Sequence, residues 1–281
     1  MLKKRKLSKP LLFIFMMMAV ALFGIPLLWT IASSFKNEFD ILQYPPVWVT
    51  ETPTTDNYTS VLQRFPFFIW LRNSLIVAVV STIIVVIFDS LAAYALARLE
   101  FRGKKFLFAL IVSMLLIPMQ IDIIPLFIMF SEFKLADHPI ALILPTTANV
   151  TGVYLLRQFF MSIPVEIEDA ARIDGCNDFR IWLQVILPLS KPVIAAVAII
   201  TFVSSWNSFL WPLIATNSEA SKTLPVGMAQ FMSASAGASG SAPAYGITLA
   251  ASVMATLPTL LMFVFLQKYF VQGITSSGVK G

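Results

Sequence analysis

The chain of 281 residues is 58% hydrophobic and only 12% charged, with a mean hydropathy of +0.81. This exceeds what the core of a soluble domain of that length needs, and it predicts a membrane protein with several spans. The single cysteine, Cys176, excludes an intrachain disulfide, and one histidine leaves no Cys/His cluster for a structural metal. The basic residues lie beside apolar runs, so we interpret them as topology signals and expect no nucleic-acid partner.

Six segments are long and apolar enough to cross a bilayer, which takes about 20 mostly apolar residues in a helix. The sequence therefore predicts an all-α polytopic membrane protein with six transmembrane helices. In chain order, the expected spans are Leu11–Ile31, Leu71–Ala97, Phe106–Phe130, Pro139–Leu156, Pro192–Ile214 and Ile247–Phe270.

The basic N-terminus "MLKKRKLSKP" precedes an apolar run that is too long for a signal peptide and has no A-x-A site after it. We interpret this run as a first membrane anchor. With the N-terminus in the cytoplasm, fifteen of the 20 lysines and arginines fall on the cytoplasmic side and five outside. This bias predicts a multi-pass protein of the cytoplasmic (inner) membrane with both termini cytoplasmic.

No linker or low-complexity segment separates independent domains. Residues 1–64 are expected to hold the N-terminal cytoplasmic segment, the first transmembrane helix and an external loop. Residues 65–275 form the predicted core membrane domain, with a charged cytoplasmic loop at 160–191, and residues 276–281 form a cytoplasmic tail.

The cytoplasmic loop contains the charged stretch "EDAARIDG", residues 168–175. Pro164 suits the first turn of a helix, and the acidic residues that follow lie where the helix dipole favours negative charge. Gly175 is a natural C-terminal stop, and Asn177 can cap a second helix. The loop is therefore predicted as a helix, a glycine turn and a second helix.

Small residues bordered by charges lie on the first helix of this loop. Ala170 and Ala171 would let the surface of another protein approach the backbone closely, while Asp169, Arg172 and Asp174 would add polar contacts. The alternative is a solvated surface helix with no partner, because charged cytoplasmic loops are common.

The loop "EDAARIDGCNDFRIWLQVILPLSKP" resembles the cytoplasmic signature of ATP-binding cassette (ABC) importer permeases, an E-A-A run with a glycine four residues after its second alanine and a later I-x-L-P. The signature falls on Asp169-Ala170-Ala171, on Gly175 and on residues 185–188. Asp169 stands where the pattern has Glu, and Val185 where it has Ile. Both keep the chemical type, but Asp169 reaches about one methylene less far.

Other stretches are similar to the carbohydrate-uptake branch of these permeases, in particular to the smaller maltose-type permease. The resemblance covers about residues 65–281. Its stretches are "RNSLIVAVVSTIIVVIFDSLAAYALARLEFRGKK", "LLRQFFMSIP", "WNSFLWPL" and "QKYFVQGITSSGVKG".

The resemblance implies the ABC type I importer permease fold, in which the loop is a coupling helix docked on a separate ATPase. It also implies a second, non-identical permease subunit, a dimer of ATPase subunits and an extracytoplasmic sugar-binding protein, all at the membrane lipid. MgATP would bind to the partner, because this chain has no G-x-x-x-x-G-K-[ST] loop and is not expected to be an enzyme. The residues implied at the ATPase contact are Glu168, Asp169, Ala170, Ala171, Asp174 and Gly175.

Maltose-type members extend their C-terminal tail between the ATPase subunits. The resemblance therefore implies a second contact through an extended tail, and a frayed terminus is the alternative. The tail residues concerned are Ser277, Gly278, Val279 and Lys280.

Two ionisable residues, Asp89 and Asp122, fall within the predicted spans, where burial is costly. Asp89 is expected near enough to the cytoplasmic side to be hydrated, and Asp122 in a water-filled cavity. An ion-coupled carrier would use them for transport, and this is the alternative function.

Trp206, Asn207, Ser208 and Trp211 combine aromatic faces with hydroxyl and amide groups, the mixture that binds sugars. Together with Asp122 they are candidates for the substrate pathway. An interfacial aromatic belt is the favoured alternative for the tryptophans.

The sequence thus predicts the permease subunit of an ATP-driven importer of a sugar, with an oligosaccharide favoured by the branch that the chain resembles. A polyol or a glycerol phosphodiester is an alternative solute. A membrane-embedded enzyme is disfavoured, because one His, one Cys and no clustered intramembrane acids offer no catalytic constellation.

Overall fold

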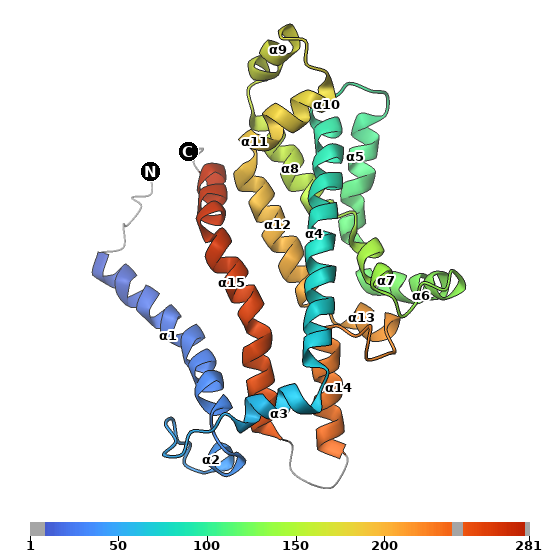
Figure 1. The fold of residues 1–281 in the computed structure, drawn as a ribbon. Helices are drawn as coiled ribbons and strands as arrows, with labels where there is room; N and C mark the ends of the chain where they lie inside the picture. Colours follow the sequence, from blue (N-terminus) through green and yellow to red (C-terminus); the bar gives the residue numbers. More distant parts are fainter. Residues whose placement is uncertain (1–8, 238–243, 279–281) are drawn as a thin grey trace. The chain divides into compact units, whose positions relative to one another are not determined.

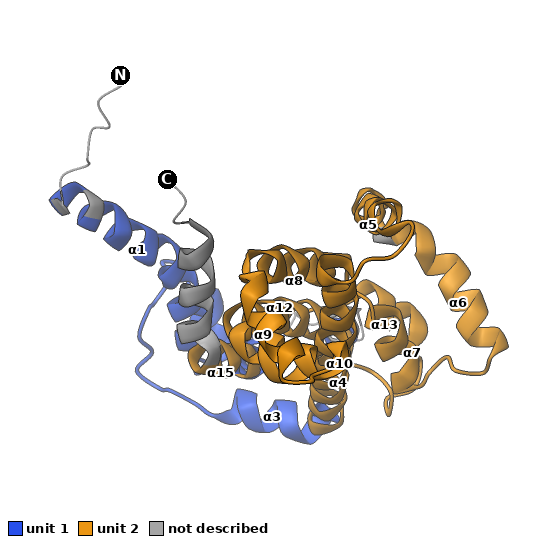
Figure 2. Cartoon of the chain, turned by 90° about the horizontal axis from the view of Figure 1, so that it is seen from above, with its two compact units in different colours: residues 1–67, 228–257 blue, residues 68–227, 258–281 orange. Residues whose placement is uncertain are grey.

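The computed structural model describes residues 9–237 and 244–278, which form helices joined by turns and loops, with no strand among them (Figure 1). The chain divides into two compact units, residues 1–67 with 228–257 and residues 68–227 with 258–281 (Figure 2). The first division lies close to the predicted boundary after residue 64. The inclusion of 228–257 in the first unit was not predicted, because hydropathy carries no signal for contacts between distant segments.

Among the residues that the structure describes, the first unit contains three helices and parts of two more. They are α1 (Lys9–Ser34), α2 (Glu38–Leu42), α3 (Asp56–Arg64), and the portions within this unit of α14 (Leu224–Gly237) and α15 (Tyr245–Gly278).

A buried lysine organises the connection that follows α1. Lys36 is fully buried, its Nζ contacts the Val47 carbonyl and the Ser33 hydroxyl, and it lies 4.1 Å from the centre of the Trp29 ring. Burial lowers the pKa of Lys36, and nearby Asp40 partly offsets this effect. A buried ammonium needs such partners, so Lys36 stabilises the loop rather than facing solvent.

The second unit is built around α4 (Phe67–Arg98). The elements that follow are α5 (Lys104–Ser113), η1 (Met114–Leu116), η2 (Met119–Asp122), α6 (Ile123–Glu132), α7 (Pro139–Ile143), η3 (Leu144–Thr146), α8 (Val150–Ser162), α9 (Val165–Ile173), α10 (Asp178–Ile181), the π-helix η4 (Trp182–Ile186), α11 (Leu187–Leu189), α12 (Lys191–Trp206) and α13 (Leu210–Ala215).

Three of the six expected spans are continuous helices in the described residues. Phe13–Ser34, Phe67–Arg98 and Tyr245–Phe265 are long and apolar enough to cross a membrane. Three further helix pairs qualify only when each bent pair is counted as one span, so the described chain has three to six candidate spans. The bent pairs are Lys104–Leu116 with Gln120–Glu132 (85°), Pro139–Thr146 with Val150–Ser162 (41°) and Asp178–Leu189 with Lys191–Trp206 (83°).

The predicted third, fourth and fifth spans are interrupted where local chemistry opposes a helix. Ile117 is extended because it precedes Pro118, and the third span breaks there. The fourth breaks after Pro145, and α8 restarts at the Asn149 cap. The expected fifth span stops at Trp206, and α13 begins only at Leu210.

One helix, α4, provides polar partners for the connection between α13 and α14. The Asn73 amide donates to the carbonyls of Ala220 and Lys222, and the Ser74 hydroxyl accepts from the Leu224 amide at 2.8 Å. In a membrane every free backbone group needs such a partner. The residues near the start of α4 thus hold this connection in place.

A pair of hydrogen bonds to Asp137 joins the loop before α7 to the chain after α13. The Asp137 carboxylate accepts hydrogen bonds from the amides of Asn217 (2.8 Å) and Ser218 (3.0 Å). Partial burial alone would raise the pKa of Asp137, but the hydrogen bonds from Ser218 and Asn217 outweigh it and lower that pKa. The acceptor of these hydrogen bonds is therefore an ionised carboxylate at neutral pH.

Candidate functional site

The charged loop folds as the sequence predicted, with two helices joined by a glycine turn. Gly175 has φ +80°, a left-handed conformation that glycine adopts without cost. The Cys176 amide donates to the Ala171 carbonyl at 3.0 Å and the Gly175 amide to the Arg172 carbonyl at 3.0 Å, which is the Schellman ending of a helix. Asn177 then caps α10, its side chain accepting from the Arg180 amide at 2.8 Å.

The structure corrects the expectation for Glu168. We expected a surface contact, but Glu168 is 3% exposed and forms an ion pair with Arg98 of α4, with 2.6 Å between Oε1 and Nε. The Arg98 guanidinium also donates to the Ile163 carbonyl, and the Tyr94 hydroxyl lies 3.5 Å from Glu168. The reason is helical spacing, because Glu168 lies on the face of α9 that packs on α4.

Burial raises the pKa of Glu168, and the positive charges of Arg98 and Arg172 partly offset that effect. Without Arg98 the buried carboxylate would have no ion-pair partner among the described residues. Glu168 and Arg98 together therefore attach α9 to the end of α4.

The other predicted residues of the loop divide between surface and core. Ala171 is half-buried and packs against the core cluster of α4, α8 and α10. Two apolar side chains that sequence reasoning missed, Ile173 (86% exposed) and Phe179 (61% exposed), lie on the outside of the loop. We use the name α9 surface for five exposed residues at the end of α9 and in the turn after it, which are Asp169, Ala170, Ile173, Asp174 and Gly175.

The missed residues carried a signal. Ile173 is a large aliphatic residue in the last turn of a helix that is otherwise charged or small there, and an exposed apolar residue beside small residues marks an interaction surface. Ile173 and Ala170 are three apart, so they lie on the same side of α9.

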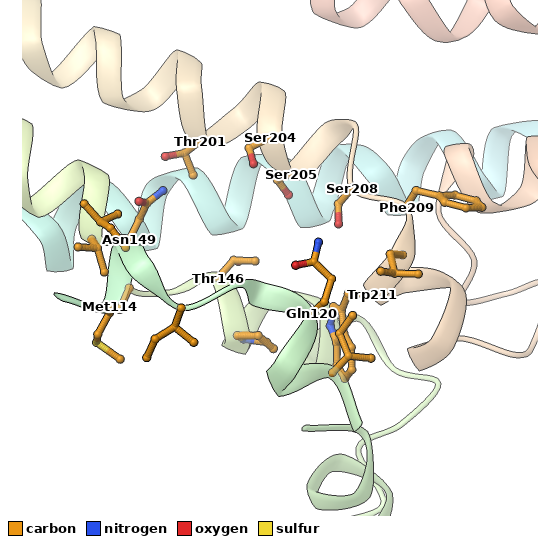
Figure 3. Close-up of a pocket in the computed structure, with 17 residues that line it drawn as sticks. Met114, Gln120, Thr146, Asn149, Thr201, Ser204, Ser205, Ser208, Phe209 and Trp211 are labelled. Atoms are coloured by element: carbon orange, nitrogen blue, oxygen red, sulfur yellow. The ribbon is translucent and has the colours of Figure 1, made fainter. Parts of the chain in front are cut away.

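The second candidate site is a cavity of about 570 Å³ within the second unit (Figure 3). It is lined from both parts of the broken third and fourth spans, from α12 and from α13. Its polar residues are Gln120, Thr146, Asn149, Thr201, Ser204, Ser205 and Ser208, and its apolar residues include Met114, Phe209 and Trp211. We call it the polar cavity.

Only part of the predicted substrate pathway reaches the polar cavity. Ser208 and Trp211 line it, and the Trp211 indole donates to the Ala141 carbonyl at 2.9 Å. Trp206 is buried and stacked on Phe202, and the Asn207 amide donates back to the Val203 carbonyl. The chain turns at Asn207 to Phe209, so neighbouring residues point in different directions.

The belt interpretation of the tryptophans is also wrong, because Trp206 and Trp211 are both buried inside the protein. Asp122 is exposed on η2 and does not line the polar cavity, contrary to expectation. Asp89 is 1% exposed. It is therefore shielded from solvent, whereas the sequence predicted a hydrated position.

Sequence reasoning missed most of the polar lining. The signal for part of it was present, since Thr201, Ser204, Ser205 and Ser208 recur at helical spacing along an otherwise apolar segment. Gln120 and Thr146 come from broken spans, and no periodicity reveals them. In the described residues no group of three His, Cys, Asp or Glu side chains could hold a metal ion.

The predicted tail contact is only partly within the described residues. α15 continues to Gly278, so Ser277 and Gly278 are helical where an extended segment was expected. Val279 and Lys280 lie outside the described residues.

Comparison with known proteins bears on both sites. The family described as "Binding-protein-dependent transport system inner membrane component" matches residues 90–276, a range that includes the α9 surface and the polar cavity. The chain belongs to this family. Its members are transport permease subunits of the inner membrane, so this chain is a membrane transport subunit.

Curated proteins that are similar to this chain align over most of its length. An arabinooligosaccharide transport permease, AraQ of Halalkalibacterium halodurans, is 36% identical over 259 residues, 91% of each chain. A trehalose/maltose transport permease, MalG of Thermococcus litoralis, is 33% identical over 263 residues, again 91% of each chain. Both names describe sugar transport by those proteins.

The fold of the permease has a solved counterpart. A chain of a bacterial ABC transporter that imports the acidic polysaccharide alginate superimposes with a TM-score of 0.81, covering 96% of this chain and all of that one. The identity is 23%, so this likeness establishes the ABC importer permease fold.

Proposed function

We propose that this permease subunit imports a sugar, with an oligosaccharide favoured, in an importer powered by ATP hydrolysis on a separate subunit. The observation that carries the proposal is the α9 surface. It combines small and apolar residues, is exposed, and lies on a helix tied to α4 by a buried ion pair. A helix held this firmly can pass a displacement imposed by a partner to the spans.

The polar cavity supports a sugar as the solute. Hydroxyl and amide groups can exchange hydrogen bonds with sugar hydroxyls, while Phe209 and Trp211 offer aromatic surface beside them. A volume of about 570 Å³ is in the range of small-molecule sites, and it carries no ionised side chain among its lining residues. Relatives named for arabinooligosaccharides and for trehalose and maltose support the same class.

The proposed partners follow from the family and from the charge distribution. The positive-inside bias of the sequence supports a cytoplasmic position for both termini and for the α9 surface, where an ATPase dimer that binds MgATP would dock. A second, non-identical permease would complete the pathway, and an extracytoplasmic sugar-binding protein would deliver the solute. The name of the family, binding-protein-dependent transport, supports the last of these.

Copurification tests the assembly. Tagged protein extracted from its native membrane in mild detergent should retain an ATPase and a second permease in stable ratio. The variant Ala170→Leu should retain the second permease and lose the ATPase, because the added side chain lies only on the α9 surface. Wild-type protein that transports sugar without either partner would contradict the proposal.

A further inference from the structure

Asp89 is a carboxylate in the interior of α4 that the proposed function does not use. It is 1% exposed. Because a carboxylate inside a membrane span is costly to bury, such a residue indicates a functional role. Its Oδ1 accepts a hydrogen bond from the Asn149 backbone amide at 3.1 Å. Its Oδ2 has no hydrogen-bond partner among the described residues.

The hydrogen bond falls at the break of the fourth span, where α8 begins. Asn149 caps that helix, its side chain accepting from the amides of Thr151 (2.9 Å) and Gly152 (3.4 Å). The cap leaves the Asn149 amide itself in need of an acceptor, and Asp89 supplies it. Negative charge beside a helix start is also favourable, so α8 and Asp89 stabilise each other.

Gly152 shows that the two helices are fitted together at this point. A Cβ atom at position 152 would lie 2.1 Å from Asp89 Oδ2, a distance that no side chain can occupy. Only glycine therefore allows α8 to approach the carboxylate. Asn149 holds Asp89 by a hydrogen bond, and Gly152 lets it come close.

The same break forms part of the wall of the polar cavity. Thr146 ends η3, lines the cavity and donates through its hydroxyl to the Ser81 hydroxyl of α4 at 2.9 Å. Asn149 lines the cavity from the other side of the break (Figure 3). Ser81 and Asp89 are two turns apart on α4, about 12 Å along its axis. One helix thus holds both ends of the break.

We propose that Asp89 is a positioning residue of the polar cavity. Its carboxylate holds the start of α8 on α4, so that Asn149 stays in the wall that faces the solute. The role needs an acceptor oxygen at position 89 and does not need a proton to be gained or lost. The inference rests on the proposed function, because it takes the polar cavity as the solute pathway.

Two substitutions of similar size distinguish the need for an acceptor oxygen from the need for an ionisable group. They are made in the complete transporter, reconstituted in proteoliposomes with its partner subunits. Asp89→Asn keeps an acceptor oxygen, and it should move sugar within about twofold of wild type. Asp89→Leu removes the acceptor, and sugar moved per ATP hydrolysed should fall by about tenfold or more while the ATPase rate stays within about twofold. Equal loss in both variants would overturn the inference, because it would show that ionisation is needed.

A double substitution distinguishes positioning from simple packing. Gly152→Ala alone should reduce the yield of folded protein because of the clash with Asp89. Asp89→Ala with Gly152→Ala removes the clash, so it should recover the yield relative to Gly152→Ala alone but not the sugar moved per ATP. Full recovery of transport would show that filling the space is sufficient, and the positioning role would be wrong.

A labelling experiment tests the geometry without relying on transport. Ala148→Cys, in a chain with Cys176→Ser, places a thiol in the cavity wall beside Asn149. Its reaction rate with a small maleimide should change by about fivefold or more in Asp89→Leu and stay within about twofold in Asp89→Asn. An unchanged rate in Asp89→Leu contradicts the inference whatever the transport result. Absence of ATP-driven transport in wild type contradicts the proposed function instead.

Discussion

Leucine in place of Ala170 is expected to leave a folded permease that no longer couples ATP hydrolysis to transport. Ala170 is exposed on the α9 surface, so three more carbons on its side chain meet no neighbour within this chain. They would hold a docked ATPase away from α9. A tenfold loss of transport corresponds to about 1.4 kcal/mol, a modest cost for a clash at an interface core. The measurements are sugar uptake, ATPase rate and melting temperature of the reconstituted complex.

The adjacent alanine provides the matched control. Ala171 is half-buried against the core cluster, so Ala171→Leu overpacks it and should lower stability by about 1–3 kcal/mol. Ala170→Leu should leave the melting temperature unchanged. Ala170→Ser, which stays small, should transport normally. Wild-type uptake by Ala170→Leu would show that the α9 surface does not dock a partner.

Methionine in place of Arg98 is expected to destabilise the protein strongly. The Arg98 and Glu168 side chains are 10% and 4% exposed, and removing the guanidinium leaves a buried carboxylate without its cation. Breaking a buried ion pair on one side costs about 3–5 kcal/mol. The same change loosens α9 from α4, so the ratio of sugar moved to ATP hydrolysed should fall as well. Thermal unfolding in detergent measures the first effect and reconstituted uptake the second.

A double-mutant comparison isolates the pair. Arg98→Met combined with Glu168→Met removes both charges, so it should be more stable than Arg98→Met alone. Glu100 is the control carboxylate, because it lies at the same end of α4 with its side chain 91% exposed in its pair with Lys104. Glu100→Gln should change stability by less than about 1 kcal/mol. Additive effects of the two methionines would mean that the pair does not join α9 to α4.

Local chemistry made the loop the most predictable part of the molecule. Asn177 as a cap and Gly175 as a stop each act on their own few residues, and the structure has both. The orientation of Glu168 was not predictable in the same way. Its partner, Arg98, is 70 residues earlier in the chain, and nothing near Glu168 in the sequence indicates which face packs on α4.

Hydropathy located the six apolar segments but not their continuity. A proline such as Pro118 permits a break, yet Pro26 lies inside the continuous helix α1. Whether a helix bends at a proline depends on whether its neighbours supply partners for the freed backbone groups. The polar cavity depends on those breaks, which is why Gln120 and Asn149 were missed while Ser208 and Trp211 were found.

Transport by a purified, reconstituted complex tests the central claim most directly. Proteoliposomes would contain this chain, the second permease and the ATPase, with the sugar-binding protein and a labelled oligosaccharide on the outside and MgATP inside. The account predicts accumulation of the sugar that requires hydrolysable ATP and the binding protein, and that an ionophore does not abolish. Accumulation by this chain alone, driven by a proton or sodium gradient and lost with the ionophore, would contradict it.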